Sequence, residues 1–335
     1  MADAPELSVI LVSGGSLETL AVPLPGLRAQ TIAKRIELII VAERGRIDVA
    51  DTAGIHGFHS VRLVEVDAPI QSRGRAAGAA ISAVTAPFFA LHENHARFEP
   101  HSYERMLAAH TASTAAVGPA VRAANAEDPV GLVMYAIAYG FCAPPVDPGP
   151  RHSLPYHNAV FVTGTIRRLP GSLSDWFARE GRLHAALLAH GFELRLAPDA
   201  EVWHVNEARP RRLLSDSWWI GRMFGHARSR DWPVIRRIGY AALLPAIAAT
   251  TWRRLFRDLR RTPDAARRLH TAALWAVPAA LAFAMGEVRG YVTTELPENP
   301  DFEKHELHVL GRLNGRRPEL TWLREAVDAI PPGTP

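Results

Sequence analysis

The sequence predicts an α/β fold with a mostly parallel central sheet and a helical C-terminal part. Short apolar β-type runs alternate with helix-like or loop segments, which is typical of parallel strands joined by crossovers. The chain has 335 residues, of which 48% are hydrophobic and 21% charged, enough to bury a sizeable core. The predicted strands are 7–12, 36–41, 61–65, 87–91 and 115–119.

The first strand ends in the turn Ser13–Ser16, which contains two glycines. Such a turn can place backbone N–H groups near a phosphate or a base, and Ser13 is a candidate for that contact. A strand-to-helix turn of any α/β protein has the same composition, so both interpretations stand. The sequence here has neither the full glycine pattern of a dinucleotide site nor the Gly-Lys-Ser/Thr of a P-loop, which disfavours NAD and ATP.

The fourth strand ends in His92-Glu93-Asn94-His95, a carboxylate between imidazoles. These side chains can bind a cation, and a strand edge that presents them is suited to chemistry. The alternative is a set of ordinary polar strand-end residues, because the chain contains 15 histidines.

These features, taken in order, resemble a family 2 glycosyltransferase with the GT-A fold. Glu93-Asn94-His95 stands where that family has D-x-D, as an E-N-H variant. The matches in chain order are the opening strand Leu7–Val12, the second strand ending at Glu43, the segment Gly74–Ala79 with Arg75, the cluster Glu93–His95, the segment Pro155–Phe161 with Asn158, the helix that follows Glu180, and the strand Ala200–His204.

The resemblance implies an enzyme that moves a sugar from a nucleotide-sugar donor to an acceptor hydroxyl, with inversion. It places Glu43, Arg75 and Glu93 at the donor, together with Ser13 of the first turn. Asn158 would bind the donor sugar or an acceptor hydroxyl, or it is an ordinary turn residue. The resemblance also implies a divalent cation on Glu93, His95 and His204. That set holds one fixed negative charge where D-x-D holds two, which favours Mn²⁺ over Mg²⁺ and leaves metal-independent activity open.

The resemblance makes Glu180 the catalytic base that takes the proton of the acceptor hydroxyl. A carboxylate in a partly dry cleft has a raised pKa and is a better base for that reason. Glu180 could instead cap the helix that runs to His190, where the helix dipole favours a negative charge. The sequence supports both roles.

The C-terminal third contains two apolar segments, Gly239–Trp252 and Thr271–Met285, separated by an arginine-rich connector. Each is shorter than the roughly 20 apolar residues of a transmembrane helix. The first is flanked by arginine pairs on both sides, which favours a helix that lies on an anionic membrane or re-enters it. A soluble helical appendage or a dimer contact is the alternative.

Charge and cysteine content limit the setting. The net charge is only +4, so we expect a local basic surface and no nucleic-acid partner. Cys142 is the single cysteine, so no intrachain disulfide can form. The first residues lack the pattern of a signal peptide, so we expect the cytoplasmic face of a membrane.

We therefore expect a GT-A domain at 1–230, with a nucleotide-binding half at 1–120 and an acceptor half at 121–230. An apolar and amphipathic helical region follows at 231–295, and a polar tail at 296–335. The acceptor would be a lipid-linked or cell-envelope glycan. Altered acidic positions leave two alternatives: an inactive GT-A-like scaffold that binds a nucleotide or a partner at the membrane, and an unrelated Rossmann-like membrane-surface protein.

Overall fold

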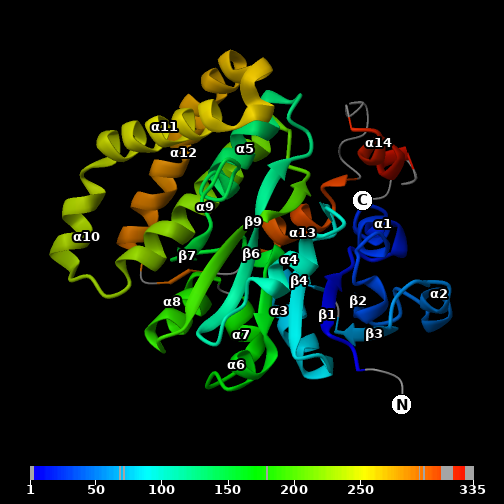
Figure 1. Ribbon diagram of the computed structural model, residues 1–335. Helices are drawn as coiled ribbons and strands as arrows, with labels where there is room; N and C mark the ends of the chain where they lie inside the picture. The colour runs from blue at the N-terminus through cyan, green and yellow to red at the C-terminus, as the bar shows by residue number, and fades with distance from the viewer. Residues whose placement is uncertain are drawn as a thin grey trace. The chain divides into compact units, whose positions relative to one another are not determined.

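The computed structural model describes residues 4–67, 69–70, 72–178, 180–293, 295–296, 299–310 and 320–328, with the backbone alone for Glu180, Asp264 and 326–328. The chain forms two compact units (Figure 1). Unit 1 comprises 1–121, 146–204 and 299–335, and unit 2 comprises 122–145 and 205–298.

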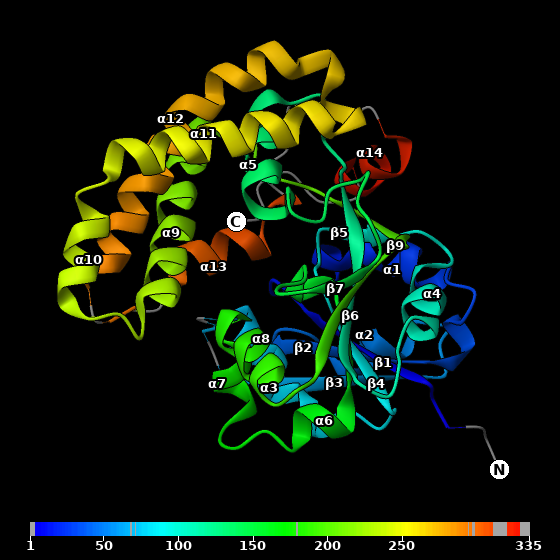
Figure 2. The ribbon, with the colours of Figure 1, turned by 60° about the vertical axis from the view of Figure 1, so that its left-hand side comes forward.

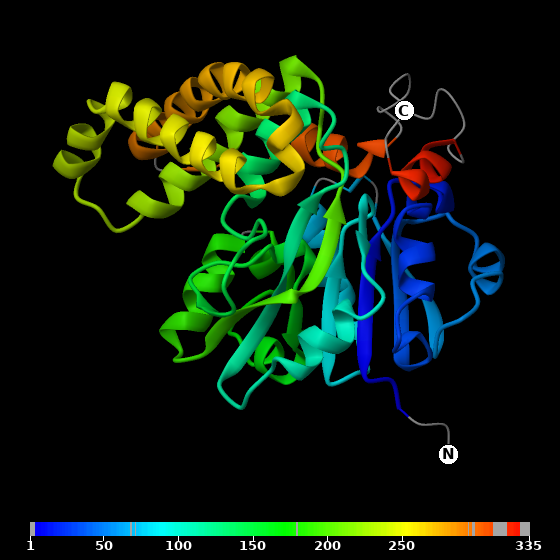
Figure 3. The same ribbon diagram turned by 45° about the horizontal axis from the view of Figure 1, so that its top comes forward.

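A nine-stranded sheet in the described part of the chain is built almost wholly from unit 1, with the order β3-β2-β1-β4-β8-β6-β9-β5 and with β7 paired to β9. Every strand predicted from the sequence is present. In Figure 3 the sheet is seen with β1 running upward, away from the N-terminus of the chain. The strands are β1 Leu7–Val12, β2 Ile36–Glu43, β3 Ser60–Val66, β4 Phe88–His92, β5 Ala96–Phe98, β6 Thr114–Ala123, β7 Gly149–Arg151, β8 Val160–Val162 and β9 Glu193–His204.

The N-terminal half of the sheet is parallel, as predicted. β1 lies between β2 and β4, with Val9 opposite both Leu38 and Ala90. All six residues of β1 are buried, which explains why this strand is apolar without alternation: both of its faces are covered. The carboxyl ends of β1 and β4 therefore lie at the same edge of the sheet.

Antiparallel strands complete the sheet. β8 pairs with β4 on one side and β6 on the other, and β5 pairs with β9. Because β9 is 12 residues long, it reaches back to the segment that follows β4. This return places the end of β9 beside the end of β4.

The matched segment Gly74–Ala79 lies in helix α3, Arg73–Ala80. The Ser72 hydroxyl accepts from the backbone N–H of Arg75 and caps it. Gly74 and Gly78, four residues apart, face α7, Leu173–Phe177, so closely that a Cβ on Gly74 would lie 1.9 Å from the carbonyl oxygen of Phe177. The glycines are thus needed for close packing of the two helices.

The other helices of unit 1 cover the sheet and its edge. α8 begins at Glu180, as predicted. Two helices form within the segment predicted as a polar tail, namely α13 and α14. The bounds are α1 Pro23–Arg28, α2 Val49–Ala53, α4 Ser102–Ala108, α6 Thr163–Arg167, α8 Glu180–Ala189, α13 Pro300–Leu307 and α14 Thr321–Asp328.

Unit 2 is helical, and its helices α9 and α12 lie side by side (Figure 2). Gly221 and Gly225 on α9 face backbone of α12, and Gly286 and Gly290 on α12 face backbone of α9, each too close for a Cβ. Small residues on both helices therefore allow the two backbones to approach. The helices are α5 Pro129–Tyr139, α9 Pro210–Ser229, α10 Val234–Ala241, α11 Leu244–Arg261 and α12 Leu269–Val292.

The expectation that both C-terminal apolar segments are too short to span a membrane is wrong for the second one. That segment lies inside a longer helix, and Ala265–Val292, 28 residues, is long and apolar enough to cross a bilayer by length and composition. The error arises because the helix begins at Leu269, before Thr271, and continues past Met285 to Val292. Since 44% of its most apolar window is buried inside the protein, a core helix passes the same test.

Candidate functional site

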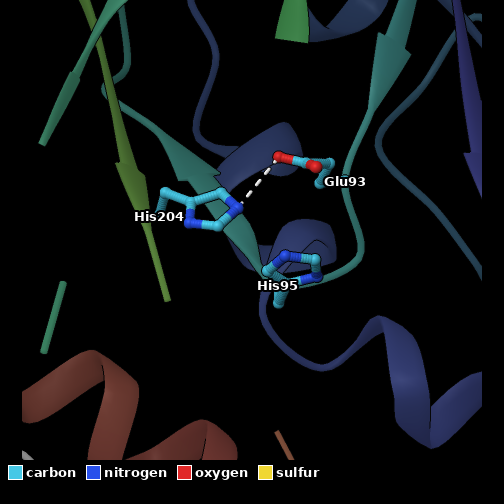
Figure 4. Close-up of side chains that lie close together, drawn as sticks. All are labelled: Glu93, His95 and His204. Carbon is cyan, nitrogen blue, oxygen red and sulfur yellow. Dashed lines mark ion pairs between the residues drawn. The ribbon is translucent and has the colours of Figure 1, made fainter. Parts of the chain in front are cut away.

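The residues predicted to hold a cation come together at one edge of the sheet. Glu93 and His95 follow β4, and His204 is the last residue of β9. Ala96, next to His95, pairs directly with His204 across the β5–β9 ladder. This register brings the rings of His95 and His204 to a centroid distance of 4.6 Å. Figure 4 shows the three side chains pointing toward one another.

The Glu93 carboxylate is buried and held from several sides. Its Oε1 accepts from the Arg73 guanidinium at 3.0 Å. Its Oε2 accepts from the Asn158 side-chain amide at 2.6 Å and lies 3.1 Å from Nε2 of His204. Burial alone would raise the pKa of Glu93, but the charges of His204 and Arg73 outweigh it and lower that pKa well below 4.5. Glu93 therefore carries a fixed negative charge.

His95 is a neutral imidazole with a defined tautomer. Burial lowers its pKa well below 6.5. The Asn94 amide donates to the carbonyl oxygen of Leu307 at 2.7 Å, so the Asn94 oxygen faces His95 Nδ1, 2.8 Å away. Because an amide oxygen can only accept, Nδ1 carries the proton. Nε2 keeps its lone pair and has no hydrogen-bond partner among the described residues.

This cluster fits a divalent cation. One ligand atom from each of Glu93, His95 and His204 lies within 4.8 Å of the others, and all three residues are buried. Histidines that bind metals usually donate their other ring N–H to an oxygen acceptor, as His95 does to Asn94. A carboxylate with imidazole nitrogens suits Mn²⁺ better than Mg²⁺, which prefers oxygen ligands.

Comparison with known proteins identifies the fold. No protein-family model and no curated protein matches the sequence. Among solved structures, the mannosyltransferase PcManGT from Pyrobaculum calidifontis, in complex with GDP-Man and Mn²⁺, is similar with a TM-score of 0.52 at 16% identity, covering 84% of this chain and 74% of that one. The chain has the GT-A fold.

Two further solved structures match with lower scores. S. aureus TarS 1–349 has a TM-score of 0.43 at 12% identity, covering 82% of this chain and 89% of that one. GalNAc-T7 with UDP, GalNAc and Mn²⁺ has a TM-score of 0.46 at 10% identity, covering 61% of this chain and 44% of that one.

In this GT-A sheet the cluster lies beyond the carboxyl end of β4, the side on which open α/β sheets bind ligands. Ser13 follows the neighbouring strand β1, and its hydroxyl closes its own turn by donating to the carbonyl oxygen of Ser16 at 2.9 Å. Glu43 ends β2 and accepts from the backbone N–H of Ile70 at 2.7 Å. Both side chains thus have a local structural role, and their donor contacts stay predictions.

Arg75 contacts the neighbouring helix α7. Its guanidinium donates to Asp175 on α7 at 2.5 Å, and both side chains are exposed. Arg73, one position before Gly74, is the arginine that reaches Glu93. Helix α3 therefore links the cluster, through Arg73, to α7, through Arg75.

A hollow of about 350 Å³ lies where α7 meets the start of α8. Glu180, the predicted base, stands in sequence between two of its lining residues, Trp176 and Arg182, while its own side chain lies outside the described residues. The Arg182 guanidinium stacks on the Trp176 ring at 5.3 Å. The lining residues are Pro170, Gly171, Ser172, Asp175, Trp176 and Arg182.

His92 and His95 differ in their hydrogen bonding. His92 Nδ1 lies 2.7 Å from the Tyr103 hydroxyl and Nε2 lies 3.1 Å from the Ala96 carbonyl oxygen. His92 is therefore a buried residue with both ring nitrogens near a partner, whereas His95 keeps Nε2 for a ligand.

Sequence reasoning did not select Arg73 or Glu306 for the site. Arg73 lies one position before the matched segment Gly74–Ala79, and only Arg75 is part of that motif. Glu306 lies on α13, more than 200 residues after Glu93, and its Oε2 is 3.8 Å from both Nε2 of His95 and the Arg73 guanidinium. No motif in the polar C-terminal segment indicates this proximity.

Proposed function

We propose that this protein is a glycosyltransferase that moves a sugar from a nucleotide-sugar donor to an acceptor hydroxyl. The observation that carries the proposal is the buried cluster Glu93, His95 and His204 at the ligand-binding edge of a GT-A sheet. The PcManGT structure, which shares the fold, contains GDP-Man and Mn²⁺, a nucleotide sugar together with a divalent cation.

The donor diphosphate needs positive charge near the cluster. A divalent cation, Mn²⁺ or Mg²⁺, would neutralise the leaving diphosphate when bound to Glu93, His95 and His204. Arg73 adds a buried guanidinium beside Glu93. Asn158 holds the Glu93 oxygen that faces His204, and so it positions the carboxylate. Ser13, Glu43 and Arg75 are proposed to contact other parts of the donor.

The acceptor is proposed to enter by the hollow at the start of α8, with Glu180 as base. An inverting transfer needs a group that removes the hydroxyl proton on the face opposite the departing diphosphate. The Trp176 ring offers an apolar face of the kind on which sugar rings stack. α3 joins this hollow to the cluster, since Arg73 contacts Glu93 and Arg75 contacts Asp175.

Unit 2 is proposed to bind an anionic membrane on the cytoplasmic side, where a lipid-linked or cell-envelope glycan would be the acceptor. Among the described residues, all the large exposed apolar side chains except Val49 lie in this unit. Such concentration marks an interaction surface. On α12 they form one stripe at helical spacing: Leu274, Val277, Leu281, Met285 and Val292.

Helix α10 strengthens this proposal. It has no buried residue, and Ile235 and Ile238 are exposed beside Arg236. Apolar side chains next to arginines suit an interface of acyl chains and anionic head groups.

The test is turnover of UDP-, GDP-, dTDP- and CDP-sugars by the purified chain, with Mn²⁺ and with a chelator, comparing the parent with Glu180→Gln. The proposal predicts turnover of one donor class, with a loss of about 10²- to 10⁴-fold in the variant, the usual contribution of a general base. If Glu180 only caps helix α8, Glu180→Gln should lower stability by about 1 kcal/mol or less and leave turnover intact. Donor binding without turnover in the parent would favour the inactive scaffold.

A further inference from the structure

Helix α13 packs against the cluster through its backbone and its carboxylates. The Leu307 carbonyl oxygen accepts from Asn94, the residue that fixes the His95 tautomer. Glu303 Oε2 accepts from the backbone N–H of Arg73 at 2.9 Å. A C-terminal segment of unit 1 thus contacts the chain on both sides of Glu93, at Arg73 and at Asn94.

Glu306, one turn after Glu303, is aimed at the nitrogen that His95 keeps for a ligand. Its Oε2 lies 3.8 Å from Nε2 of His95, too far for a hydrogen bond. Two ligands of one cation stand about 3 to 3.5 Å apart when each lies about 2.1 Å from the ion. The 3.8 Å between Glu306 Oε2 and His95 Nε2 is therefore only slightly longer than the distance between two ligand atoms of one cation. A small rotation of the Glu306 side chain would bring the two atoms to that distance.

Charge points the same way. Glu93 is the only carboxylate among Glu93, His95 and His204, so these three leave a divalent cation with a net positive charge. The Glu306 carboxylate supplies a second negative charge and an oxygen ligand, which Mn²⁺ and Mg²⁺ both favour. With it, the site regains the charge of a two-carboxylate site.

We propose that Glu306 is the fourth protein ligand of the cation bound by Glu93, His95 and His204. This inference rests on the cation site of the proposed function. α13 then closes the cation site from the C-terminal side, and its carbonyl at Leu307 holds Asn94 and, through it, His95 in the orientation that binds.

The experiment measures Mn²⁺ binding to the full-length protein without donor, by the loss of the free Mn²⁺ electron paramagnetic resonance signal. Glu306→Gln should weaken Mn²⁺ affinity at least about tenfold, the lower end of what altered metal surroundings cost. Glu303→Gln is the matched control: it removes the same charge from the same helix, keeps an acceptor for Arg73, and should bind Mn²⁺ like the parent. Glu306→Asp, which keeps the carboxylate on a side chain one methylene shorter, should retain more Mn²⁺ affinity than Glu306→Gln.

Three results would overturn the inference. Unchanged Mn²⁺ affinity in Glu306→Gln, together with lost affinity in Glu93→Gln, would show that the cation site exists without Glu306. Equal loss of Mn²⁺ affinity in Glu303→Gln and Glu306→Gln would also show that Glu306 is not a ligand. No Mn²⁺ binding by the parent would remove both the cation site and the fourth ligand. Melting temperatures of all variants show whether each one folds.

Discussion

The His95 imidazole donates its Nδ1 proton to the side-chain oxygen of Asn94, 2.8 Å away, and this hydrogen bond leaves Nε2 as the ligand atom. The middle residue of the E-N-H motif therefore has a positioning role. Its amide, in turn, is oriented by the Leu307 carbonyl oxygen.

Replacement of Asn94 by leucine should weaken Mn²⁺ binding by about 10- to 100-fold, because the acceptor that fixes the His95 tautomer is lost. Isothermal titration calorimetry measures this directly. Asn94→Asp is the comparison, since a carboxylate still accepts the Nδ1 proton, and it should bind Mn²⁺ more tightly than Asn94→Leu. Equal binding by all three proteins would show that Asn94 does not orient His95.

Gly286→Ala should destabilise the protein by about 1 to 3 kcal/mol, the usual cost of overpacking. The added Cβ would lie 1.9 Å from the backbone carbonyl oxygen of Trp218 on α9, so a helix must move. Gly239→Ala on α10 is the control, because nothing lies within 4 Å of its Cβ, and it should be neutral or slightly stabilising. Thermal denaturation that gave the same melting temperature for both variants would contradict the close packing of α9 and α12.

Ile235→Asp should reduce sedimentation of the protein with anionic vesicles, because a charge replaces an exposed apolar side chain on α10. Val49→Asp is the control: Val49 is 68% and Ile235 77% exposed, but Val49 lies in unit 1. The parent should bind anionic vesicles more strongly than neutral phosphatidylcholine vesicles, and its binding to the anionic vesicles should fall with added salt. Equal and negligible sedimentation with both vesicle types would refute the membrane surface.

Stability should decrease as the pH falls from about 6.5 toward 4, and His184 should contribute to the decrease. Burial lowers the pKa of His184 to about 4, so the folded state keeps it neutral while the unfolded chain takes up the proton near 6.5. Because the unfolded state then binds more protons, one such group costs up to about 1.4 kcal/mol per pH unit. His184→Gln should show a shallower dependence of unfolding free energy on pH in urea titrations. The same slope as the parent would contradict a neutral buried His184.

The sequence was sufficient for the strands that carry the site. Apolar runs such as Leu7–Val12 are buried on both faces, and that burial leaves a pattern in the composition. The motif resemblance predicted that Glu93, His95 and His204 form one site, and the β5–β9 register places His204 opposite Ala96, next to His95. Local pattern and chain order were enough for this part.

The contribution of helix α13 to the site could not be predicted from the sequence. Glu306 approaches His95 through the packing of α13, a short polar helix, and such tertiary contacts leave no periodic signal. Arg73 and Arg75 are two residues apart, and only the direction of α3 decides which one faces Glu93. The continuation of α12 past Met285 is also a tertiary feature, since Gly286 and Gly290 lie against the backbone of α9.

The most direct test of the account is calorimetric binding of UDP, GDP, dTDP and CDP to the parent and to Glu93→Gln, with Mn²⁺ and with EDTA. Glu93 supplies the fixed charge of the proposed cation site, so one nucleoside diphosphate should bind the parent with Mn²⁺ and lose affinity both in EDTA and in the variant. Nucleotide affinity that neither EDTA nor Glu93→Gln alters would contradict the claim that Glu93, His95 and His204 hold the donor diphosphate through a cation.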